Sequence, residues 1–245
     1  MNDSLRRVSY WHIWKGCKKV SPACKNCFIR NFDTVELFNP ICPERPYGTI
    51  IIPCIHSDFF IEEADRWRED VWKQIKKNNH LIYLIITKRV ERIKNCLPDD
   101  WGDGYDNVIL SCTVETQEIA YKRIPEFLEI PCKHRWLSCC PLIEELNLTD
   151  YLSIGLIEHI ECCGEIGDPD IIRPTYYEWV EDLFNQCKTY NIRFSFMKIG
   201  HKFIKDGETH LERAICYHSK MADACNLNYY KPLYFILDDK EFILE

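Results

Sequence analysis

The chain has 245 residues, of which 46% are hydrophobic and 28% charged, as in globular proteins with a sizeable core. Its formal net charge of −7 argues against a broad duplex-binding face, because such faces need a surplus of basic side chains. No apolar run is long enough to cross a membrane and no secretory signal is recognisable, so we expect a cytoplasmic protein. In that compartment the 15 cysteines are expected to be thiols or metal ligands.

Short apolar runs rich in β-branched residues alternate with longer amphipathic segments, and this alternation predicts βα units with a parallel sheet. The predicted strands are 8–13, 49–55, 81–86, 107–114, 135–139, 157–162 and 193–197. The predicted helices are 28–38, 61–77, 90–96, 117–128 and 176–190. Asp58 lies close enough to the second helix to cap its first turn.

The periodic pattern fades near residue 200, where a helix at 211–224 and a strand at 233–237 are the remaining predictions. We therefore predict an α/β fold, an incomplete parallel (β/α) barrel of about six or seven βα units, formed by residues 1–200. Residues 201–245 are expected to form a C-terminal extension packed on this barrel. In such sheets, reactive groups gather at the carboxyl ends of the strands.

Three cysteines follow the first predicted strand: Cys17, Cys24 and Cys27. Their spacing suits three ligands of a 4Fe–4S cluster, whereas a closed structural zinc site or a four-thiolate cluster needs four protein ligands. Three thiolates leave one iron open, and an open position on a cluster is where chemistry can occur.

A zinc site is the alternative for these cysteines, and it needs a fourth ligand. His12, His56 and Cys42 are candidates for that ligand. A pair of cysteines with a third six residues upstream is unusual for zinc ribbons, in which pairs meet pairs, so we favour iron–sulfur.

Polar residues follow the predicted strands at the point where each apolar run stops. Taken singly, each fits helix capping better than chemistry. Five such endings at one edge, beside three cysteines, favour a site. They are His56-Ser57-Asp58, Thr87-Lys88-Arg89, Glu115-Thr116-Gln117, Gly164-Glu165-Ile166-Gly167 and Lys198.

The residues at these strand ends match the groups of S-adenosylmethionine. Ser57 and Asp58 offer acceptors for its amino group, and Lys88 or Arg89 offers a cation for its carboxylate. Glu115 is placed to accept hydrogen bonds from the ribose diol. The open iron would chelate the amino acid moiety, and the cofactor would carry the radical chemistry while the protein orients it.

Together these motifs resemble the radical S-adenosylmethionine superfamily, and within it a branch encoded by phages and bacteria. The resemblance covers residues 10–200 and rests on four motifs. They are Trp11…Gly16-Cys17…Cys24…Cys27-Phe28, Ser57-Asp58-Phe59-Phe60, Thr87-Lys88-Arg89 with Arg92, and, more loosely, Cys112-Thr113-Val114-Glu115-Thr116-Gln117. The resemblance implies that Phe28 lies beside the cofactor.

Two strand ends depart from the pattern of this branch. Cys140 stands where the branch has a glutamate, and Cys163 and Ile166 replace a glycine and a serine around Glu165. A lost carboxylate and a more apolar loop imply an unusual substrate. Cys140 is either a hydrogen-atom donor or a small filler, and we favour the filler because buried cysteines are usually inert.

The activity within this branch that we consider closest is queuine lyase. That resemblance implies a free deazapurine base as substrate, cleavage of its carbon–nitrogen bond, and an electron donor such as flavodoxin or ferredoxin. Glu161 and Glu165 are candidates for the amidine-like edge of the base. Trp14 and Phe59 are candidates for an aromatic wall, as is Tyr10.

Two rival interpretations remain. A radical enzyme acting on nucleic acid, similar to spore photoproduct lyase, should show a basic groove, yet the best basic clusters are Lys18-Lys19 and the lysines at 73, 76 and 77. A zinc-stabilised binding module would leave the polar strand ends unexplained.

Overall fold

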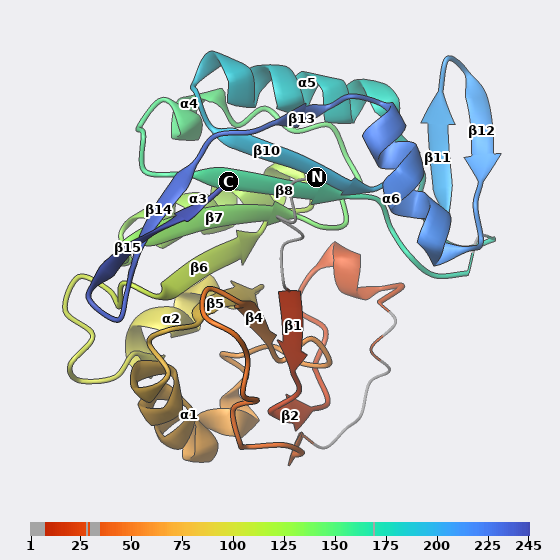
Figure 1. The fold of residues 1–245 in the computed structure, drawn as a ribbon. Helices are drawn as coiled ribbons and strands as arrows, with labels where there is room; N and C mark the ends of the chain where they lie inside the picture. Colours follow the sequence, from red (N-terminus) through yellow and green to blue (C-terminus); the bar gives the residue numbers. More distant parts are fainter. Residues whose placement is uncertain (1–7, 28, 30–34, 169) are drawn as a thin grey trace.

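The computed structural model describes residues 8–27, 29, 35–168 and 170–245. Within them the chain folds as a mixed α/β protein around a curled sheet of eight strands, with the order β1-β4-β5-β6-β7-β8-β10-β13. All neighbouring strands run parallel except β13, which is antiparallel to β10. Figure 1 shows the sheet curving like half of a barrel, with α1 and α5 on its outer side.

All seven predicted strands are present, with ends that differ by no more than two residues. The sheet strands are β1 (Val8–Trp11), β4 (Ile50–Pro53), β5 (Ile82–Thr87), β6 (Val108–Thr113), β7 (His134–Cys139), β8 (His159–Cys163), β10 (Arg193–Lys198) and β13 (Asn228–Tyr229). The helices are α1 (Asp65–Lys77), α2 (Val90–Ile93), α3 (Gln117–Leu128), α4 (Thr149–Leu152), α5 (Tyr177–Thr189) and α6 (Ile215–Ala224).

Alternation along each strand separates two faces of the sheet. Leu110, Leu137 and Ile160 lie in the large core cluster that also includes α1, α3 and α5 side chains. Ile82, Ile109 and other residues of opposite parity lie in a second cluster on the inner face. Period-two alternation with both faces buried is expected for a parallel sheet inside a partial barrel.

A C-terminal hairpin covers part of the inner face. It consists of β14 (Leu233–Leu237) and β15 (Lys240–Leu244), which pair antiparallel. Phe235 and Leu237 join the inner cluster. The buried Arg193 anchors this segment, since its guanidinium donates to the carbonyls of Lys231 at 2.7 Å and Glu245 at 2.8 Å.

Several short strands have no clear periodic signal and were not predicted. They are β2 (Trp14–Lys15) with β3 (Glu36–Leu37), and the sheet of β9 (Thr175–Tyr176), β11 (Lys202–Lys205) and β12 (Glu208–Leu211). The predicted helix at 28–38 is wrong at residues 36–37, while 28 and 30–34 lie outside the described residues. The predicted cap is also wrong, because α1 begins at Asp65 and the Asp58 carboxylate accepts from the Phe60 amide instead.

None of the described helices is both long and apolar enough to cross a membrane.

Candidate functional site

The cysteine loop, residues 16–27, lies at the carboxyl edge of the parallel strands. Its first residue is tied to the end of β4, because the Gly16 amide donates to the carbonyl of His56 at 3.2 Å and the Ser57 hydroxyl donates to the Gly16 carbonyl. Gly16 has φ +94°, a left-handed conformation that glycine adopts without a steric cost. We call this edge, with the loop above it, the mouth of the sheet.

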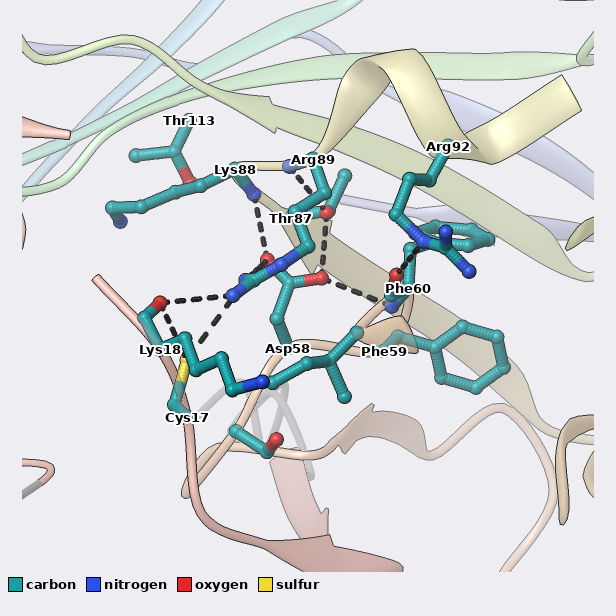
Figure 2. A network of polar contacts seen from close by, with 12 residues as sticks. Cys17, Lys18, Asp58, Phe59, Phe60, Thr87, Lys88, Arg89, Arg92 and Thr113 are labelled. Carbon is teal, nitrogen blue, oxygen red and sulfur yellow. Dashed lines mark hydrogen bonds and ion pairs between the residues drawn. The ribbon is translucent and has the colours of Figure 1, made fainter. Parts of the chain in front are cut away.

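Asp58 is the centre of a buried polar network under the loop (Figure 2). One carboxylate oxygen accepts from the Thr87 hydroxyl at 2.7 Å and from the Phe60 amide at 2.9 Å. The other accepts from the Lys88 amide at 2.9 Å and lies 3.1 Å from the Arg89 guanidinium. The carboxylate therefore joins the ends of β4 and β5, which leaves it less available to a ligand than the sequence predicts.

Arg89 links this network to the cysteine loop. Its guanidinium donates to the carbonyl of Lys18 at 2.8 Å and lies 3.9 Å from the sulfur of Cys17. Both Arg89 and Asp58 side chains are about 6% exposed, so the pair is shielded from water. A buried cation held by a carboxylate thus fixes the position of the first cysteine.

A second ion pair holds the other end of the loop. Glu165, which follows β8, accepts from the amide and guanidinium of Arg173 and from the Asn26 side chain at 3.1 Å. Arg173 also donates to the carbonyl of Pro22 at 3.1 Å. Residues after β5 therefore bind one end of the loop and residues after β8 bind the other. Both carboxylate oxygens of Glu165 already accept hydrogen bonds.

The Glu165 anchor predicts a pH-dependent contribution to stability. Burial alone would raise the pKa of Glu165, but the hydrogen bonds from Arg173 and Asn26 outweigh it and lower the pKa below its ordinary value. A lowered pKa gives stability that is present above the unfolded-state pKa and lost as the pH falls through the folded-state pKa. We expect Glu165→Gln to lower the free energy of unfolding by about 1–2 kcal/mol at pH 7.

Urea unfolding of both proteins between pH 3 and pH 8 measures this difference. It should be constant well above the unfolded-state pKa of about 4.3 and shrink as the pH falls below that value toward the lowered pKa of the folded state. Glu178→Gln, on the exposed side of α5, is the matched control. A difference that did not change with pH would contradict the charged anchor.

The three thiols differ in their surroundings. Burial raises the pKa of Cys17 despite Arg89 beside it. Burial also acts to raise the pKa of Cys24, but hydrogen bonds from the backbone of Val20 and from Ser21, with the charge of Lys88, outweigh it and lower the pKa. Cys27 is exposed.

In the described part of the chain, no three His, Cys, Asp or Glu side chains converge as the ligands of a metal ion. Three thiols on one short loop are nevertheless the donor set that an iron–sulfur cluster needs, with cations at the ends of β5 close by.

Two further predicted residues lie at the mouth. The Lys88 side chain points away from Asp58 (Figure 2), and its charge reaches Cys24. Glu115 follows β6, is fully buried, and has one oxygen 2.8 Å from the guanidinium of Arg123. Its other oxygen has no hydrogen-bond partner among the described residues. A buried carboxylate oxygen of this kind suits a hydroxyl ligand.

Two of the three predicted aromatic-wall residues are buried. Trp14 and Phe59 are fully buried core residues that pack against each other with ring centroids 5.5 Å apart, so neither ring is exposed to a ligand, whereas Tyr10 is exposed. Phe28 lies outside the described residues. Glu161 is a buried residue on the inner face of β8.

Of the fourth ligands suggested for zinc, the two histidines lie together and Cys42 has another partner. His12 and His56 stack with ring centroids 4.6 Å apart, whereas Cys42 lies 3.1 Å from the hydroxyl of Tyr83.

The comparisons with known proteins place the chain in a family. A family model described as "Protein of unknown function (DUF5131)" matches residues 33–221, more than three quarters of the chain. The chain belongs to this family. The matched region contains the ends of β4, β5, β6 and β8 and begins after the three cysteines. No curated protein and no solved structure gives a significant match.

Three residues of the site were missed at the level of sequence: Asn26, Arg173 and Arg123. The first two are anchors that form through contacts over 139 and 151 residues, which no local pattern indicates. Arg123 had a signal, because it falls on the buried stripe of α3 among Ile119, Ala120, Ile124 and Phe127. A charged residue on an apolar helix stripe usually has a buried partner.

Proposed function

We propose that this protein is a radical S-adenosylmethionine enzyme of the partial-barrel type that acts on a small deazapurine base, queuine. The observation that carries the proposal is the position of the cysteine loop. A buried ion pair, Asp58–Arg89, and a half-buried one, Glu165–Arg173, hold the loop over the carboxyl ends of parallel strands, where the reactive groups of such sheets gather.

Cys17, Cys24 and Cys27 would hold a 4Fe–4S cluster through three of its irons. When bound and reduced, this group supplies the electron that cleaves S-adenosylmethionine to a 5′-deoxyadenosyl radical. Arg89 would fix the loop next to Cys17 and stabilise its thiolate form, because a nearby cation favours the charged state of a thiol.

The other residues at the mouth would orient the cosubstrate. Lys88, whose side chain is free of the Asp58 network, would bind its carboxylate. The unpaired oxygen of Glu115 would accept a hydrogen bond from the ribose diol. The hydroxyl of Ser57 is bonded to Gly16, so it would contribute to the loop more than to the ligand.

The decisive experiment is purification without oxygen, reconstitution with iron and sulfide, reduction, and addition of S-adenosylmethionine with and without queuine. We expect a brown protein that forms 5′-deoxyadenosine and, with queuine present, a new deazapurine detected by mass spectrometry. If 5′-deoxyadenosine forms while queuine is untouched, the cofactor chemistry stands and the substrate is wrong. A colourless protein that retains only zinc would overturn the proposal.

A further inference from the structure

Two cysteines lie side by side where β7 and β8 end. The register pairs Cys139 of β7 with Cys162 of β8, and Cys140 and Cys163 each come one residue later. Neighbouring strands are about 4.8 Å apart, within the Cα–Cα range of about 4.4–6.8 Å that a disulfide requires. The sulfur of Cys140 lies 3.7 Å from the carbonyl oxygen of Glu161 and is in hydrogen-bond contact with the Cys163 side chain. The two thiols are therefore close enough to react with each other.

This pair of thiols is accessible, whereas the pair that precedes it is not. Cys139 and Cys162 belong to the large core cluster and are fully buried. Side chains alternate between the two faces of a strand, so Cys140 and Cys163 point toward the opposite, inner face. Both are half-buried, which leaves them partly accessible at the mouth.

The backbone around the two thiols is held in place. The Leu142 amide donates to the carbonyl of Cys163 at 2.8 Å, which ties the segment after Cys140 to the end of β8. The Gly164 amide donates to the carbonyl of Lys198 at 2.9 Å, which ties the segment after Cys163 to β10. Groups that are held in contact react faster than the same groups in free solution, because the entropy of bringing them together is already lost.

The surroundings of the two thiols assign them different steps in thiol–disulfide exchange, in which a thiolate attacks a disulfide sulfur. The hydrogen bond with Cys163, and burial after it, raise the pKa of Cys140 well above its ordinary value. Cys140 therefore keeps its proton while Cys163 attacks first. A Cys163 sulfur in a disulfide carries no charge, so the largest cause of the raised pKa of Cys140 is then removed. Cys140 can lose its proton at that stage and attack in turn.

We infer that Cys140 and Cys163 form a redox-active dithiol, which low-molecular-weight disulfides such as glutathione disulfide oxidise to a disulfide. The Cys163 thiolate attacks one sulfur of glutathione disulfide, the S–S bond breaks, and one glutathione leaves as a thiolate. The Cys140 thiolate then attacks the Cys163 sulfur of the mixed disulfide and releases the second glutathione. Two protein thiols are oxidised, one glutathione disulfide is reduced, and the two protons pass to the departing thiolates.

The disulfide joins the ends of β7 and β8 beside the cysteine loop. Glu165 follows Cys163 by two residues and binds Asn26 of that loop at 3.1 Å. The dithiol therefore makes this part of the mouth sensitive to oxidation. The inference is independent of the proposed function, since it requires neither an iron–sulfur cluster nor S-adenosylmethionine.

Mass spectrometry of the full chain, equilibrated in glutathione buffers with a rising proportion of glutathione disulfide, tests the inference. After alkylation of the remaining thiols under denaturing conditions, cleavage at glutamate releases Cys140 and Cys163 in separate peptides, and fragmentation identifies the linked residues. We expect a link between Cys140 and Cys163 in most molecules in the oxidised buffers, and its loss on return to reduced glutathione. Cys139 and Cys162, in the same two peptides, are the matched control and should remain thiols.

The variant Cys140→Ser separates the two steps, because Cys163 can still attack but no second thiol follows. It should accumulate glutathione on Cys163 to a level at least about fivefold above that of the wild type. In Cys163→Ser, the glutathione adduct on Cys140 should form at least about tenfold more slowly. Circular dichroism checks that both variants fold, and the wild-type result decides if they do not.

Three results would overturn the inference. The first is a folded wild type without a link between Cys140 and Cys163 in the oxidised buffers. The second is a wild type that carries only stable glutathione adducts on these two thiols. The third is an equal yield of a link between the buried Cys139 and Cys162, which would indicate oxidation of an unfolded chain.

Discussion

Alanine at Cys17, Cys24 or Cys27 is expected to abolish 5′-deoxyadenosine formation, with a loss of at least about 1,000-fold. An open-iron cluster has only three protein ligands, so each thiolate is indispensable. Iron content should fall together with activity, and the brown absorption of the reconstituted protein should disappear. Iron and sulfide analysis and product mass spectrometry on the three variants measure this effect.

Cys216→Ala provides a control, since Cys216 is exposed like Cys27 but lies on α6. We expect this variant to keep the iron content and activity of the wild type. The cluster assignment would be wrong if Cys27→Ala behaved like Cys216→Ala. Equal iron loss in all four variants would instead indicate a general dependence on accessible thiols.

The central part of the fold was predictable because its residues repeat a simple pattern. The strand β5 is an apolar run up to its last residue, β6 begins with the apolar residues Val108–Leu110, and α1 and α5 each present a periodic apolar stripe. The small strands β2, β3, β9 and β12 contain two to four residues each and are too short to show a period. Pairing with distant segments determines them, and a local pattern does not contain that information.

The residues of the site were easier to predict than their roles. The strand-end rule correctly brings Ser57, Asp58, Lys88 and Glu165 to one edge, because parallel strands all end there. It does not show which partners these side chains have. Asp58 and Glu165 were expected to face ligands, whereas each is bound to an arginine that holds the cysteine loop. Residue type and spacing predicted which side chains lie at the strand ends. Contacts between residues distant in sequence determine which of those side chains can still bind a ligand.

Asp58→Asn is expected to have the largest effect on stability among the charged residues of the site, about 3–5 kcal/mol in the free energy of unfolding. The substitution leaves the buried guanidinium of Arg89 without a counter-charge and turns an amide N–H toward a donor, the Lys88 amide or the Arg89 guanidinium. Urea unfolding at pH 7 measures the loss. Asp106→Asn breaks an ion pair with Lys133 in which the Asp106 side chain is 45% exposed, and it should cost no more than about 1 kcal/mol.

The double variant Asp58→Asn/Arg89→Met distinguishes a buried ion pair from a simple packing contact. Removal of both charges should recover much of the stability, because the unpaired cation rather than the lost attraction causes most of the damage. The cysteine loop should not recover, since Lys18 and Cys17 lose their donor. We therefore expect the double variant to have a free energy of unfolding close to that of the wild type, but a severalfold lower iron content after reconstitution. A double variant with wild-type iron content would show that Arg89 stabilises the fold but does not position the loop.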